Sequence, residues 1–156
     1  MHTWFECKIS YEKTMENGMM KKVTEPYLVD ALSFTEAEAR IIEEIRPFIS
    51  GEFTVADIKR ARLSELFFDE TGDRFYRVKV NFITLDEKSG AEKKTASQML
   101  VQASTLQEAI ANLEKGMKGT LADYTIASVS ETAIMDVFQF DAAGVPANKP
   151  ELESIA

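Results

Sequence analysis

The chain has 156 residues, is 45% hydrophobic and 28% charged, and carries a formal net charge of −8. This is the composition of a folded globular protein, and the acidic balance argues against one that coats nucleic acid through general basicity. The single cysteine excludes an internal disulfide, and neither a leader pattern nor an apolar run of about 20 residues is present, so we expect a cytoplasmic protein with no membrane partner.

The chain opens with a predicted β-hairpin. Apolar and polar residues alternate in "WFECKISY" (4–11), which is typical of a half-buried strand. Asn17 and Gly18 then supply a turn, and "KKVTEPYLVDA" (21–31) returns as the second strand.

A helix is expected to follow the hairpin. Ser33 and Glu36 have the spacing of a capping box, in which the hydroxyl and the carboxylate bind free amides at the helix start. Apolar residues at helical spacing predict its core-facing side: Phe34, Ala37, Ile41, Ile45 and Phe48. The next segment, "FTVADIKRARLSELF" (53–67), reads as a strand whose alternation breaks near Asp57, which predicts a β-bulge or a bend.

The same pattern returns about 70 residues later. "FYRVKVNF" (75–82) matches the first strand at an offset of 71, and Leu28-Val29 matches Leu100-Val101 at an offset of 72. Thr105 and Glu108 repeat the capping box. The second predicted core face contains Leu106, Ala109, Ile110, Leu113 and Met117, and the last segment breaks alternation near Ser128.

The repeats predict an α+β fold made by internal duplication of a ββαβ unit. We expect antiparallel sheets, one helix per repeat and an approximate two-fold relation. Repeat 1 is assigned to 4–68 and repeat 2 to 75–140, which together form one compact domain. Residues 141–156 are polar with two prolines and are expected to be a flexible tail.

Catalytic chemistry finds little support in the sequence. His2 is the only histidine and lies beside the start of the chain, and Cys7 lies on a predicted strand with no histidine to activate it. No phosphate loop or metal-ligand spacing is present. We therefore expect a protein that is not an enzyme, with no catalytic residue, metal or cofactor.

The most distinctive difference between the repeats is a basic segment. Lys59, Arg60 and Arg62 correspond to Ser130, Glu131 and Ala133 in repeat 2. Further basic and aromatic residues follow in the next strand: Tyr76, Arg77 and Lys79. Basic residues with aromatics on a sheet favour single-stranded nucleic acid or an anionic nucleotide. The alternative is a charged strand edge that blocks unwanted pairing, with its aromatics in the core.

Three stretches carry a family resemblance: "WFECKISYEK", "YLVDALSFTEAEARI" and "IKRARLSELFF". Through them the chain, to about Phe140, resembles the domain of unknown function 4494 family of Bacteroidota and their phages. The resemblance implies a small cytoplasmic protein, often carried by mobile elements, and it implies no activity, cofactor or catalytic residue.

These observations predict a non-enzymatic binding module associated with phages or mobile elements. The first hypothesis is a nucleic-acid-binding accessory protein that uses the basic segment defined above. The alternatives are an oligomeric binder that sequesters an anionic nucleotide and a structural module that recruits a partner chain through a strand edge.

Overall fold

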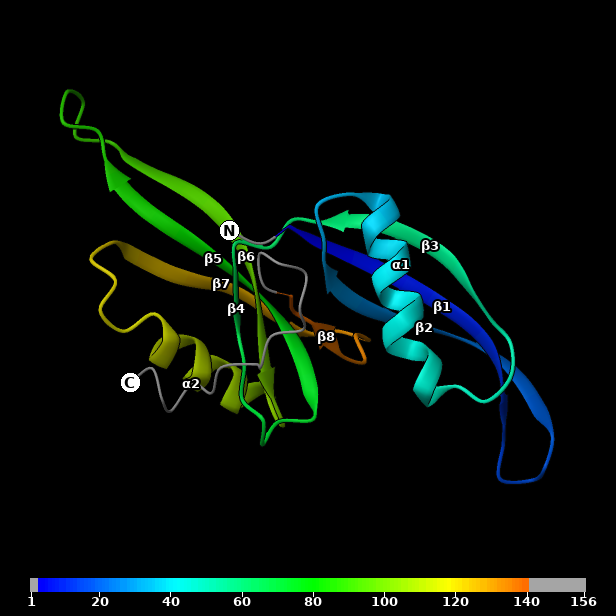
Figure 1. The fold of residues 1–156 in the computed structure, drawn as a ribbon. Coiled ribbons are helices and arrows are strands. Elements are labelled where there is room, and N and C mark those ends of the chain that lie inside the picture. The colour runs from blue at the N-terminus through cyan, green and yellow to red at the C-terminus, as the bar shows by residue number, and fades with distance from the viewer. Residues whose placement is uncertain (1–2, 141–156) are drawn as a thin grey trace. The chain divides into compact units, whose positions relative to one another are not determined.

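The structure, a computed structural model, describes residues 3–140. They form two compact units (Figure 1). Each unit has its own hydrophobic core. Unit 1 contains residues 3–62 and 133–140, and unit 2 contains residues 63–132. His2 and the predicted tail, 141–156, lie outside the described residues.

Unit 1 contains a four-stranded sheet with a helix over one face. Its elements are β1 (Trp4–Thr14), β2 (Met20–Asp30), α1 (Phe34–Ile45), the 3-10 turn η1 (Arg46–Phe48), β3 (Phe53–Ala61) and β8 (Val137–Phe138). The strand order is β3-β1-β2-β8. The first three strands are antiparallel, whereas β8 runs parallel to β2.

Unit 2 repeats this arrangement. Its elements are β4 (Glu65–Phe67), β5 (Arg74–Leu85), β6 (Glu92–Ala103), α2 (Leu106–Gly116) and β7 (Asp123–Glu131). The strand order is β4-β6-β5-β7, and β4 runs parallel to β6. The predicted α+β class, with one helix for each mainly antiparallel sheet, is therefore confirmed.

Both predicted capping boxes are present. The N–H of Glu36 donates to Ser33 Oγ, and the N–H of Glu108 donates to Thr105 Oγ1, at 3.1 Å in each case. The glutamate carboxylates accept from the N–H of the residue before the cap, which is Leu32 ahead of α1 and Ser104 ahead of α2. These bonds satisfy amides that have no partner within the helix, which fixes where each helix begins.

Each helix packs on one sheet face. In unit 1 the core contains Ala37, Ile41 and Ile45 of α1 against alternate residues of β1. Phe34 and Phe48, expected on this face, are 54% and 79% exposed. Phe48 lies beyond the α-helix in η1, where Pro47 interrupts helical hydrogen bonding, so the 3.6-residue period no longer applies.

The predicted bulges occur at matching places. Opposite β1, the register skips Ala56 between Val55 and Asp57. Opposite β5, it skips Ala127 between Ile126 and Ser128. The extra residue explains why the alternation of apolar and polar residues breaks at this point in both segments.

The two short strands are where the units differ from the predicted repeats. β4 follows β3 in sequence but completes the sheet of unit 2, and β8 follows β7 but completes the sheet of unit 1. The two compact units therefore do not coincide with the predicted repeats 4–68 and 75–140: the last strand of each sheet comes from the stretch that follows the other unit's edge strand in the sequence. Local sequence patterns cannot show this because the pairing is non-local.

Candidate functional site

The predicted basic segment is divided between the units. Lys59, Arg60 and Arg62 belong to unit 1, whereas Arg77 and Lys79 lie on β5 of unit 2. Neighbouring residues of a strand point to opposite faces. Lys59 accordingly lies beside Glu6, with an ion pair of 3.3 Å, while Arg60 is the partner of Phe5, on the face that α1 covers.

Tyr76 does not join Arg77 and Lys79. Its side chain is 3% exposed and packs in the core of unit 2 with Val78 and Val80, on the face opposite the two basic residues. Phe67, another aromatic of the segment, is in the same core. The rings are therefore not available to stack on bases, as the strand-edge alternative expected. Nucleic-acid binding by the remaining basic side chains stays a prediction.

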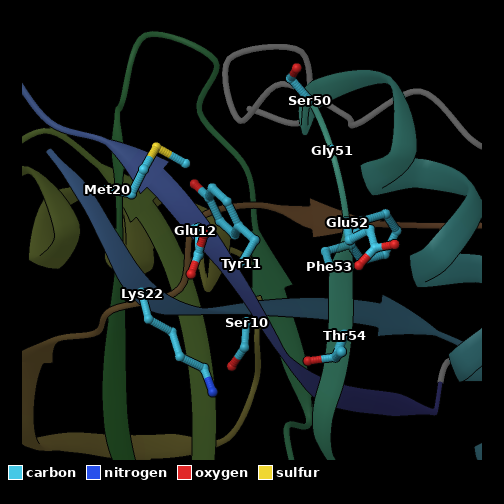
Figure 2. Close-up of a pocket in the computed structure, with 10 residues that line it drawn as sticks. All are labelled: Ser10, Tyr11, Glu12, Met20, Lys22, Ser50, Gly51, Glu52, Phe53 and Thr54. Carbon is cyan, nitrogen blue, oxygen red and sulfur yellow. The ribbon is translucent and has the colours of Figure 1, made fainter. Parts of the chain in front are cut away.

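Unit 1 contains a cavity of about 560 Å³ near the outer ends of its long strands. Figure 2 shows its lining, which comes from three chain segments. Ser10, Tyr11 and Glu12 come from β1, Met20 and Lys22 from β2, and residues 50–54 from β3 and the loop before it. The Tyr11 hydroxyl is already engaged, since it donates to Glu25 Oε1 at 2.8 Å.

A groove runs between α1 and β3. Two cavities of about 340 and 430 Å³ lie along it, and Val55 lines both. On the helix side the lining residues fall four apart, which places them on one stripe: Phe34, Glu38, Ile42 and Arg46. On the strand side they are Gly51 and Glu52 of the loop before β3, and Phe53, Thr54, Val55, Asp57 and Ile58 of β3. We call this surface the α1–β3 groove.

The groove borders an open strand edge. Within the described residues β3 pairs with β1 alone, so one row of its backbone N–H and C=O groups faces away from the sheet. Phe53, Val55 and Ile58 are only partly buried against the core of unit 1. Apolar side chains and free backbone groups thus occur along one line, which is the combination that an added strand requires.

One end of the groove is acidic. Glu38 and Asp57 both line the smaller cavity, and no described cation forms an ion pair with either carboxylate. Both negative charges also disfavour ionisation of the fully buried Cys7 thiol. Burial, followed by Glu6, Asp57 and Glu38, raises the pKa of Cys7 to about 12. A thiol with that pKa is protonated at neutral pH and is a poor nucleophile.

The tyrosines near this sheet are also protonated at neutral pH. Burial, with help from the Glu25 carboxylate, raises the pKa of Tyr27 to about 12. The hydrogen bond that Tyr11 donates to Glu25 is the main reason why the pKa of Tyr11 is raised as well. These groups stabilise structure by donating hydrogen bonds and are unsuited to act as bases.

Residues 3–140 contain no cluster of three or more His, Cys, Asp or Glu side chains that could hold a metal ion. Within the same range, neither helix is long and apolar enough to span a bilayer.

The α1–β3 groove was not predicted from the sequence. Two signals pointed toward it: the helical stripe that contains Phe34, and the irregular strand near Asp57. The first signal predicts a core position, because an apolar residue at helical spacing is usually buried. The groove lies where α1 and β3 meet, so it depends on tertiary packing that a local sequence pattern does not show.

The described residues form an α+β chain of two compact units, with a groove between α1 and β3 of unit 1. Residues 3–140 match the family described as Domain of unknown function (DUF4494), so the chain belongs to that family. No curated protein and no solved structure gives a significant match to the chain.

Proposed function

We propose that this protein is a non-enzymatic module that binds an extended polypeptide segment in the α1–β3 groove. The observation that carries the proposal is the open edge of β3 beside partly exposed apolar side chains. A bound segment adds as a further strand, its backbone pairs with β3, and alternate side chains enter the two cavities.

The groove also suggests the chemistry of the segment. Apolar residues of the ligand contact Val55 and Ile42, which line the larger cavity. At the acidic end, a Lys or Arg of the ligand lies near Glu38 and Asp57. At the other end Arg46 and Glu52 both line the cavity, and their opposite charges favour neither sign. The preferred ligand is therefore an extended apolar segment with a basic residue toward one end.

Protein binding accounts for the geometry better than stacking of nucleic-acid bases does. Tyr76 is buried, and Lys59 is neutralised by Glu6.

Two further features also belong to the proposal. We propose that the units arose by internal duplication, supported by the matching bulges at Ala56 and Ala127. The setting in phages or mobile elements rests on the family resemblance alone.

A displayed library of random 12-residue peptides tests the binding proposal. Peptides selected on the full chain should be apolar with a basic residue, and NMR shifts on binding should concentrate at 53–58. A double variant, Glu38→Lys with Asp57→Lys, should weaken these peptides at least tenfold, because it reverses the charge at the acidic end.

The matched control is Glu43→Lys, an exposed position on the same helix that does not line the groove. It should leave affinity unchanged. The proposal fails if no peptide is selected, or if the selected peptides bind the double variant and the parent equally. Fluorescence anisotropy with labelled single-stranded DNA, at low salt, checks the nucleic-acid alternative on the same samples.

A further inference from the structure

Residues 133–140, here called the donor segment, complete unit 1. Val137 is fully buried beside its strand partner Leu28, and Phe140, which is 6% exposed, belongs to the core that α1 covers. The N–H of Met135 donates to the Pro26 carbonyl at 2.9 Å, and the N–H of Leu28 donates to the Asp136 carbonyl at 3.0 Å. The edge of β2 therefore acts as an acceptor for this segment.

The connection to the donor segment is short and fixed at both ends. On the unit 2 side, the N–H and the hydroxyl of Thr132 both donate to the Phe75 carbonyl, at 2.9 and 2.8 Å. On the unit 1 side, the first bond is made by Met135. Only Ala133 and Ile134 lie between these anchors.

The other short strand has an equivalent attachment. The N–H of Ser64 donates to the Gln98 carbonyl at 2.9 Å, as Met135 does to Pro26. Leu66 is the strand partner of Leu100, as Val137 is of Leu28. The same connection therefore occurs twice in the chain. A short strand, β4 or β8, follows the edge strand of one unit in the sequence and pairs in the sheet of the other.

From this geometry we infer that the donor segment can be exchanged between two copies of the chain, which gives a reciprocal dimer. The β2 edge is identical in every copy, so the exchanged strand makes the same backbone and core contacts as the strand of its own chain. The exchange changes the path of the two-residue connector and costs the entropy of association. Short connectors held at both ends favour exchange, and longer ones favour the closed monomer.

Refolding at high protein concentration tests the inference. Protein unfolded in guanidinium and refolded by limited dilution should contain a dimer by size-exclusion chromatography with light scattering. The dimer should persist on further dilution, because reversal requires unit 1 to open. Inserting Gly-Ser-Gly between Ala133 and Ile134 should reduce the dimer fraction several-fold. The same insertion between Asn17 and Gly18, in an exposed turn, should leave it unchanged.

Cysteine trapping identifies the exchanged strand. In a Cys7→Ala background, one variant carries Leu28→Cys and the other Val137→Cys, two positions that are strand partners. Refolding the mixture at high concentration should give a disulfide-linked dimer of the two variants, whereas mixing proteins refolded separately should not. The inference is overturned if the unmodified chain refolds only to monomer, or if its dimer forms without this cross-link and is insensitive to the connector insertion.

Discussion

Gly72 lies directly against the backbone of Ala103, at the end of β6: a Cβ added to Gly72 would be 2.5 Å from the Ala103 Cα. The neighbouring atoms are backbone atoms of a paired strand, so they cannot move aside as a flexible side chain would. Gly72 is therefore required by packing between the β4–β5 turn and β6.

The first prediction is that Gly72→Ala destabilises the protein by about 3 kcal/mol, because overpacking against backbone forces the turn away from β6. Urea unfolding followed by circular dichroism measures the change. Asp73→Ala, the exposed neighbouring position, is the control and should change stability by less than about 0.5 kcal/mol. Equal stability of Gly72→Ala and the parent would show that the turn adapts.

The second prediction concerns pH and the same turn. The hydroxyl of Thr71 and the amide of Asn112 donate to the Asp69 carboxylate, at 2.6 and 3.0 Å. The Thr71 hydrogen bond is the main reason why the pKa of Asp69 is lowered. The stabilisation by this carboxylate is thus complete above its ordinary pKa and is lost as pH falls through the lower folded-state value.

Asp69→Asn should therefore cost roughly 1 kcal/mol at about pH 7, and the difference from the parent should shrink toward about pH 3. Urea unfolding of both proteins across this range gives the two curves. Asp123→Asn, at an exposed position on β7, provides the comparison. A difference that stays constant with pH would mean that the ionised form of Asp69 contributes nothing.

The third prediction is that the Cys7 thiol is unreactive in the folded protein. Its complete burial and a pKa of about 12 leave almost no accessible thiolate at about pH 8. Reaction with a chromogenic disulfide reagent should be negligible in buffer and complete in guanidinium. Rapid reaction of the folded chain would indicate that the sheet opens around β1.

The fourth prediction is that Phe140→Ala destabilises unit 1 by about 3–4 kcal/mol. The ring is 6% exposed, and the Arg40 guanidinium lies over it at 4.3 Å from the centroid. Trp4 is the only tryptophan and belongs to unit 1, so its fluorescence reports unfolding there. Met135→Ala, a change at a half-exposed side chain of the donor segment, should have a much smaller effect.

Features that depend on near neighbours were predictable from the sequence. Ser33 and Thr105 cap the two helices, as predicted from the glutamate three residues after each of them. The bulge beside Asp57 follows from a break in local alternation. Tyr76 could also have been assigned to the core, because it shares the period of Val78 and Val80. In this segment the alternation is therefore a better guide to the position of the ring than the aromatic composition is.

Features that depend on distant pairing were not predictable. β4 and β8 have three and two residues, too few for a period to be detected. In the sequence, Leu66 falls within the segment 53–67 and Val137 within the matching segment 124–138, so neither is marked as part of a separate strand. The basic segment is likewise split by distant pairing: unit 1 ends at Arg62 and unit 2 begins at Leu63, so its basic residues belong to two different units. The groove beside β3 likewise depends on where α1 lies over the sheet.

The position of β8 also sets the order in which the protein is completed during synthesis. All of unit 2 among the described residues lies within 63–132, so its strands are available once that stretch has left the ribosome. Unit 1 must wait for Val137 and Phe140, although its other strands were made first. Until then the β2 edge of the nascent chain has no β8 to pair with. Chains made side by side on one messenger RNA would be at high local concentration, which favours the exchange of β8 inferred above.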